Sequence, residues 1–227
     1  MADKPRVKAP KQVKAPKQRA AHSRGDASRR KLLFGVGGAL GVAVLVAVGL
    51  FVLLGSSGGG DVRSKLEAAG CTLTDYPGVS RRHIRNPAAR PKQWNSFPPT
   101  SGPHYFTPAV YGIYSEPLQL ARVLHNLEHG GVYMLYGSET PADTATKLGE
   151  IYDKDPRGLV VAPLPELGKT IALGAWTSEH PGSAEVGTGH LAKCTAVDTG
   201  AFEAFIKEYR GRGPEGYTLD QLQPGGT

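Results

Sequence analysis

The chain has 227 residues, enough for one or two folded domains, and carries a formal net charge of +7 at pH 7. Residues 1–31 contain 11 Lys and Arg and 2 Asp; subtracting these from the totals of 27 and 20 leaves 16 basic and 18 acidic residues in 32–227. The positive charge therefore belongs to the N-terminal segment, which argues against a nucleic-acid-binding domain, because such a domain carries its basic patch on the fold.

The first 31 residues contain a direct hexapeptide repeat, Val-Lys-Ala-Pro-Lys-Gln, at 7–12 and again at 13–18. The segment has no apolar periodicity and too little apolar surface to offset the entropy lost on ordering. We therefore expect residues 1–31 to form a disordered basic cytoplasmic tail. Its role would be to set membrane topology and to attract anionic lipid head groups, with no specific nucleic-acid partner.

Residues 32–54 form an apolar run of 23 residues without a charge. As a helix, this run is long enough to cross a hydrocarbon core of about 30 Å. Its five glycines would destabilise a helix of a soluble domain but are common in membrane spans. A cleaved signal peptide is the main alternative, but the run exceeds the usual apolar region and no A-x-A site follows. We predict a single transmembrane helix at 32–54.

The basic residues before this span place the N-terminus in the cytoplasm and the rest of the chain outside, at the cell membrane. A flexible Gly/Ser linker at 55–60 would lead into an extracytoplasmic globular domain at 61–216, followed by a flexible tail at 217–227. Cys71 and Cys194 both fall in this domain. An oxidising compartment favours a disulfide between them, and two separate buried thiols are the alternative.

The domain has the pattern of an α+β fold. We predict helices over 62–69, 116–129 and 140–153, strands over 132–136, 159–164 and 170–176, and a last helix with an apolar stripe that ends at Gly211. After the central helix at 116–129 the order is β-α-β-β-α, which predicts a small mixed sheet with helices packed on it. Residues 177–190 are polar and glycine-rich, and we expect His180 and His190 to be solvated there.

The central helix carries two histidines, His125 and His129, on one face. At 100° per residue they lie about 40° apart, whereas the leucine face points the other way and should pack on the sheet. The histidine face then needs another segment to cover it. The proline-rich segment at 87–108 is the nearest candidate, because its prolines exclude a helix and its aromatic residues indicate an ordered loop. This loop carries His104.

Two histidines at positions i and i+4 of a helix can hold one metal ion. His104 is our third candidate ligand, and His83 or Glu128 would be a fourth. Imidazole ligands suit zinc, copper, nickel and iron, so the residue types do not select among these metals, and we name zinc or copper as the cofactor. The alternative is a structural cluster, in which His129 interacts with the dipole at the helix C-terminus.

Residues 125–129 also match H-x-x-E-H, an inverted zinc-protease pattern in which the glutamate is the general base. The context argues against a protease, because the helix stops at Gly130-Gly131 directly after the motif. We therefore favour a protein without catalytic activity, and the sequence leaves open whether the chain is an enzyme. A metal-dependent hydrolase with Glu128 as its base is one alternative, and a cell-envelope interaction module with a structural histidine cluster is another.

Four segments of the chain resemble one known family. They are Asn-Ser-Phe-Pro-Pro-Thr-Ser-Gly-Pro-His-Tyr at 95–105, Gly-Ile-Tyr at 112–114, His-Asn-Leu-Glu-His-Gly-Gly-Val at 125–132 and Arg-Gly-Arg-Gly-Pro-Glu at 210–215. They look like the domain of unknown function 3105 family, over about 61–216. Members often carry an N-terminal membrane anchor. The resemblance implies no known activity, but it suggests that His104, His125 and His129 belong to one site, with His83 as a weaker fourth member.

Overall fold

The computed structural model describes residues 59–226 of the chain. The predicted basic tail at 1–31, the predicted membrane span at 32–54 and the linker up to residue 58 lie outside the described residues. Within 59–226, no helix has both the length and the apolar character that a bilayer crossing requires.

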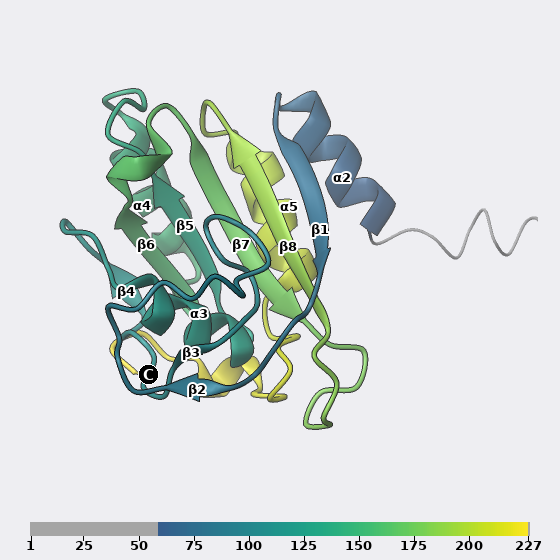
Figure 1. The fold of residues 1–227 in the computed structure, drawn as a ribbon. Coiled ribbons are helices and arrows are strands. Elements are labelled where there is room, and N and C mark those ends of the chain that lie inside the picture. Colours follow the sequence, from purple (N-terminus) through teal and green to yellow (C-terminus); the bar gives the residue numbers. More distant parts are fainter. Residues whose placement is uncertain (1–58, 227) are drawn as a thin grey trace, which may run out of the picture. The chain divides into compact units, whose positions relative to one another are not determined.

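The described residues form an α+β domain around one central sheet (Figure 1). Its elements are α2 (Gly59–Ala68), β1 (Thr72–Pro77), β2 (His83–Ile84), β3 (His104–Tyr105), β4 (Gly112–Ile113), α3 (Leu120–Glu128), β5 (Val132–Tyr136), α4 (Thr144–Lys154), β6 (Leu159–Pro163), η1 (Pro165–Leu167), β7 (Ile171–Thr177), β8 (Thr188–Cys194), α5 (Thr199–Tyr209) and η2 (Leu219–Gln221). The six-stranded sheet has the order β1-β8-β7-β5-β6-β4, and β2 and β3 form a separate pair.

The predicted mixed sheet is confirmed. Strand β6 runs parallel to β4 and β5, whereas β1, β7 and β8 form antiparallel pairs. The predicted order needs two corrections. Strand β8 occupies part of the segment that we expected to be a loop, so the order after α3 is β-α-β-β-β-α, and β1 was also not predicted. In addition, α3 begins at Leu120, after the proline at 117 rather than before it.

Two apolar cores fill the faces of the sheet. One lies between the sheet and helices α2, α4 and α5, where Phe202 and Phe205 are fully buried. The other lies between the sheet and α3, where Leu124, Leu127 and Trp176 are fully buried. In Figure 1, α4 and α5 lie behind the sheet, whereas α3 and the loops around β2 and β3 lie in front of it. The predicted leucine face of the central helix therefore packs on the sheet, as expected.

The first and last segments of the domain are both linked to the central sheet and its cores. Cys71, which follows α2, forms a disulfide with Cys194 at the end of β8, as the sequence predicted. The segment after 216, for which we expected a flexible tail, contains η2 and places Leu222 in the second core. Backbone hydrogen bonds join Gly158 to Leu222 and Tyr111 to Gly226. The tail packs because its apolar residue completes the core beneath α3.

A close backbone contact joins the end of α3 to the segment that follows α5. A Cβ atom added to Gly213 would lie 2.2 Å from the backbone nitrogen of Gly130 and 2.4 Å from the carbonyl oxygen of Glu128. The neighbouring Gly211 N–H donates to the carbonyl of Gly130. Only a residue without a side chain can therefore hold this contact.

We expect Gly213→Ala to lower the free energy of unfolding by about 1–3 kcal/mol, the usual cost of forcing an extra carbon into a packed site. Urea denaturation would measure it. The matched control is Gly149→Ala in α4, where the new Cβ meets its nearest atom at 3.8 Å. Alanine there should stabilise the helix by up to about 1 kcal/mol. Equal effects of the two substitutions would contradict the close contact.

Candidate metal centre

A rigid loop positions His104. The side-chain oxygen of Asn95 accepts hydrogen bonds from the backbone N–H groups of Thr100 (3.2 Å) and Ser101 (2.9 Å). The indole N–H of Trp94 donates to the carbonyl of Pro103 at 2.8 Å. These bonds satisfy the buried polar groups of an otherwise irregular segment, so the loop is ordered despite its prolines. The imidazole of His104 at its end is fully buried.

Strand pairing places a second histidine beside His104. The parallel register of β2 and β3 sets His83 directly opposite His104. Their ring centroids lie 5.0 Å apart. The side chain of His83 is 46% exposed, whereas that of His104 is inaccessible. The pair therefore reaches from the protein interior to its surface.

Helix α3 supplies the opposite side of the site through His125 and Glu128. The helix is held against the loop by Asn126, whose amide oxygen accepts from the N–H of Ala109 (2.9 Å) and whose amide nitrogen donates to the carbonyl of Ala109 (2.8 Å). Asn126 thus pairs with the loop backbone as a neighbouring strand would. The predicted cover of the histidine face by the proline-rich loop is confirmed.

Four side chains converge on one point. They are His83, His104, His125 and Glu128, and each offers one ligand atom within 4.8 Å of the others. Four ligands that each lie about 2 Å from one ion fit within this span. Three imidazole nitrogens and one carboxylate form a ligand set that first-row transition metals accept. This group could therefore hold a metal ion.

Backbone carbonyls orient the two buried imidazoles. The Nδ1 of His104 lies 2.8 Å from the carbonyl oxygen of Gly102, and the Nδ1 of His125 lies 2.7 Å from that of Tyr105. A carbonyl oxygen can only accept, so both Nδ1 atoms carry protons. In the neutral rings, each Nε2 then keeps a lone pair for a ligand. This is the arrangement that second-shell partners give to metal-bound histidines.

The Nε2 of His104 also lies 2.9 Å from the Oε2 of Glu128. Both nitrogens of this ring thus face oxygen acceptors, and only a doubly protonated ring could donate to both. A cation next to Nε2 and Oε2 would satisfy the same atoms with a neutral ring. The chemistry of the four side chains therefore fits a metal ion.

Arg81 holds the carboxylate of Glu128, whose side chain is 1% exposed. The Nε of Arg81 donates to Oε1 at 2.7 Å. Burial favours a higher pKa for Glu128, but its hydrogen bonds and electrostatic interactions with His104 and Arg81 outweigh burial and lower the pKa to about 2. Glu128 is therefore an anion at neutral pH. Both of its oxygens already have partners, so Glu128 is fixed beside the histidines and is not a free general base.

His129 does not join the first group. Its Nε2 lies 3.0 Å from the Oε2 of Glu215, and its ring stacks on Tyr217. With His125 and Glu215 it forms a second group that could hold a metal ion, so the two groups share His125. The Nδ1 of His129 is buried and has no hydrogen-bond partner among the described residues.

Burial keeps His125 and His129 neutral. Desolvation lowers the pKa of each to about 4, although the hydrogen bond that His125 donates to the Tyr105 carbonyl and the charge of Glu128 beside His129 act in the opposite direction. Between the unfolded pKa of about 6.5 and the folded pKa, the unfolded chain binds protons that the folded chain does not. The free energy of unfolding therefore loses nothing to these histidines above pH 6.5, and it falls as the pH drops towards 4.

In metal-free protein, we expect each of these histidines to reduce stability by about 1.4 kcal/mol per pH unit on acidification across this window. Urea unfolding at pH 6.5, 5.5 and 4.5 would measure the slope. The His125→Gln/His129→Gln variant should have a flatter slope than the parent, whereas His180→Gln, at a side chain that is 77% exposed, should not change it. Parallel slopes for parent and double variant would contradict the burial argument.

A cavity of about 480 Å³ lies beside the first group. It is lined by His83, Glu128, Arg81 and Glu215 together with Val79 and Val186. A molecule in this cavity would be next to two of the four candidate ligands. The exposed edge of the group therefore faces a space that small ligands can enter.

Two members of this region, Arg81 and Glu215, were not among the predicted site residues. Glu215 ends one of the four segments that carry the family resemblance, so its position in the sequence was a usable signal. Nothing in the sequence around Arg81 indicated its role. His180 is exposed, as expected, but His190 is not solvated: it lies in β8 with hydrogen bonds to Asp75 and Thr177.

The sequence profile of one family, described as a protein of unknown function (DUF3105), matches residues 87–221. This match includes three of the four residues of the first group, His104, His125 and Glu128, and it includes Glu215. Neither a curated protein nor a solved structure matches the chain. Because the match covers more than half of the 227 residues, the chain belongs to the DUF3105 family of proteins of unknown function.

Proposed function

We propose that the protein is a membrane-anchored, extracytoplasmic domain that binds one transition metal ion through His83, His104, His125 and Glu128. The observation that carries the proposal is the convergence of these four ligand atoms within 4.8 Å. The carbonyl partners of His104 and His125 support it, because they direct both Nε2 lone pairs away from the backbone. Zinc or copper is the ion that we propose, since both accept imidazole and carboxylate ligands.

The test is metal binding by the purified full-length chain. Equilibrium dialysis against Zn²⁺ and Cu²⁺, followed by elemental analysis, should give one ion per chain. Bound metal should also raise the melting temperature, because a ligand at 100 times its Kd adds about 2.7 kcal/mol to the stability of the folded state. Protein that is purified without metal and takes up none on titration would disprove the proposal and leave a structural histidine cluster.

A metal-dependent hydrolase is the second candidate function, and the cavity beside His83 and Glu128 favours it. A catalytic metal site needs an open coordination position next to a space for substrate. In this candidate, Glu128 would bind the metal, and it would not be the general base, because Arg81 and His104 already engage its oxygens. Hydrolysis that is lost with EDTA and restored by zinc would support this function.

The proposed location is the outer face of the cell membrane. A disulfide between Cys71 and Cys194 supports an oxidising compartment, and the apolar run at 32–54 supports an anchor. In this topology, the protein should remain in the membrane pellet after alkaline carbonate extraction. Protease added to intact cells stripped of their wall should digest the domain. Full release by carbonate, or complete protection from protease, would contradict this placement.

A further inference from the structure

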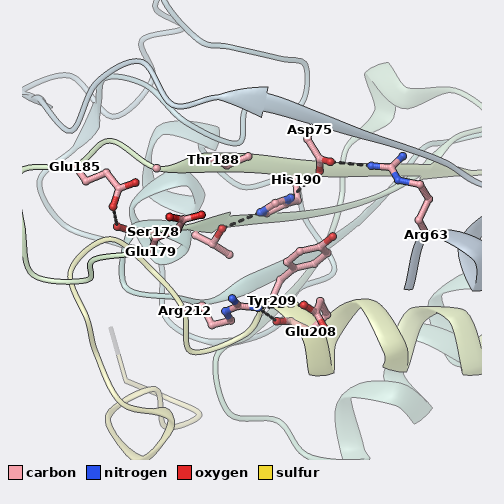
Figure 2. A pocket seen from close by; sticks show the side chains of 12 residues that line it. Arg63, Asp75, Ser178, Glu179, Glu185, Thr188, His190, Glu208, Tyr209 and Arg212 are labelled. Atoms are coloured by element: carbon pink, nitrogen blue, oxygen red, sulfur yellow. Dashed lines mark hydrogen bonds and ion pairs between the residues drawn. The ribbon is translucent and has the colours of Figure 1, made fainter. Parts of the chain in front are cut away.

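A second polar cluster lies on the opposite face of the sheet from the histidine site. It lines a cavity of about 470 Å³ where strands β1, β7 and β8 meet the end of α5 (Figure 2). Three of its residues form a hydrogen-bonded chain on adjacent strands: Asp75, His190 and Thr177. Strand register sets Asp75 directly opposite His190 on one side and Ala175 opposite it on the other, and Thr177 lies two residue pairs further along.

The chain of hydrogen bonds has a defined direction. The Oδ2 of Asp75 accepts a hydrogen bond from the Nη2 of Arg63 at 2.7 Å. The Oδ1 of Asp75 lies 2.7 Å from the Nδ1 of His190. Figure 2 shows this line from Arg63 through Asp75 to His190. A carboxylate held by a guanidinium accepts hydrogen bonds, so the proton is on Nδ1. The Nε2 lone pair then accepts from the hydroxyl of Thr177 at 2.8 Å.

The imidazole is also fixed in orientation and charge. Its ring stacks on Tyr209, with 4.0 Å between centroids and an angle of 15° between planes. Burial lowers the pKa of His190, and the hydrogen bond and charge of Asp75 only partly oppose this. Burial raises the pKa of Tyr209 to about 12, so the stacked phenol stays neutral. At neutral pH, His190 is therefore a free base that points at a hydroxyl.

We propose that Thr177 is the nucleophile and His190 the general base of a second site, which hydrolyses small, uncharged or cationic carboxylic esters. A hydroxyl, an imidazole and a carboxylate bonded in this order are the working parts of acyl-transfer sites on unrelated folds. Hydrogen bonds that only stabilise neighbouring strands do not need a cavity beside them. Thr177 nevertheless lines a cavity whose size suits a small molecule. The family match begins at residue 87, so Arg63 and Asp75, which belong to this cluster, lie outside the matched segment.

The charges around the cavity select the substrate class. Its lining includes four carboxylates and two guanidinium groups, a net charge of −2: Asp75, Glu179, Glu185, Glu208, Arg63 and Arg212. This field disfavours carboxylate or phosphate substrates and accepts neutral or cationic ones. Arg212 lines the same cavity, and its Nη1 donates to the Oε1 of Glu208 at 3.1 Å. We assign the guanidinium of Arg212 to the negative charge that develops on the carbonyl oxygen.

The reaction balances with water as the only co-reactant. Oγ1 of Thr177 bonds to the ester carbonyl carbon, and its proton moves to Nε2 of His190. The bond to the alcohol oxygen then breaks, and His190 returns the proton to that oxygen. Water attacks the acyl-threonine and gives a proton to His190, the carboxylic acid leaves, and the proton returns to Thr177.

The test uses the full-length protein and a fluorophosphonate, which forms a covalent bond with activated hydroxyls. Mass spectrometry should find the adduct on the peptide that contains Thr177, and p-nitrophenyl acetate should be hydrolysed at the same site. Thr177→Val should remove both signals, and Thr177→Ser should keep them. His190→Gln should slow labelling by about 100-fold or more, the typical contribution of a general base.

The matched control is Thr72→Val, because Thr72 is an exposed strand threonine of β1 that does not line the cavity. It should leave labelling unchanged, and an unchanged melting temperature in all variants would show that they fold. An unlabelled parent protein, or an adduct that persists in Thr177→Val, would overturn the proposal. Hydrolysis abolished by EDTA would also overturn it, because both groups of candidate metal ligands among the described residues lie in the histidine cluster, and the activity would then belong there.

Discussion

Replacing His104 with alanine is expected to reduce zinc affinity by at least about 100-fold, since even the loss of a second-shell partner costs 10–100-fold. The imidazole of His104 is fully buried and its orientation is fixed by Gly102, so no other side chain can take its place. Isothermal titration calorimetry on the full-length chain would measure the change. The matched control is His180→Ala, which removes an exposed histidine and should leave the affinity unchanged.

Two further variants distinguish the two ligand groups. His125 belongs to both groups, so His125→Ala should abolish tight binding in either case. His129 belongs only to the group with Glu215, so His129→Ala should change the affinity much less than His104→Ala does. A large loss with His129→Ala and a small one with His104→Ala would instead place the ion between His125, His129 and Glu215. Unchanged affinity in His104→Ala would contradict the proposed site.

Loss of the disulfide should have the largest effect on stability. The bond joins residues that are 123 positions apart, and the chain-entropy model gives about 5 kcal/mol for a loop of that size. We expect the Cys71→Ala/Cys194→Ala variant to melt about 10–20 °C lower than the parent protein, because 1 kcal/mol corresponds to about 2–4 °C in a domain of this size. Differential scanning calorimetry would measure the shift.

A reductant provides an independent check on the same bond. Treating the parent protein with dithiothreitol should lower its melting temperature by a similar amount and should not change that of the double variant. Both cysteines are buried, so the reductant should be added to unfolded protein before refolding. An equal melting temperature with and without the bond would show that the disulfide adds no stability.

Much of the fold was predictable because its central elements have strong local signals. The strand at 132–136 was predicted with its observed bounds, and the helices at 140–153 and around Phe202 lie within a few residues of α4 and α5. Strands β1 and β8 could not be predicted in this way. Asp75 and His190 share a face of these strands with the buried Leu73 and Ala192, so a polar pair interrupts the apolar alternation that is the signal of a strand.

The candidate site was predictable in part. The repeat of the helix placed His125 and His129 on one face and left Glu128 about 60° away on the other side of His125. Periodicity cannot tell from which side a second segment approaches. In the structure, β3 approaches on the side of Glu128, so His104 meets Glu128, and His129 meets Glu215 instead. The ligand types followed from the sequence, whereas their grouping depended on a contact between distant segments.

The pairing of β1 with β8 sets the order in which the domain can form during synthesis. Strand β1 is at the edge of the sheet, and its neighbour begins at residue 188. A nascent chain that has emerged only as far as β7 therefore has no strand with which β1 can pair, and Cys71 has no thiol to join. Contacts of such long range form slowly. The first strand must wait, unpaired, until nearly the whole domain has left the ribosome.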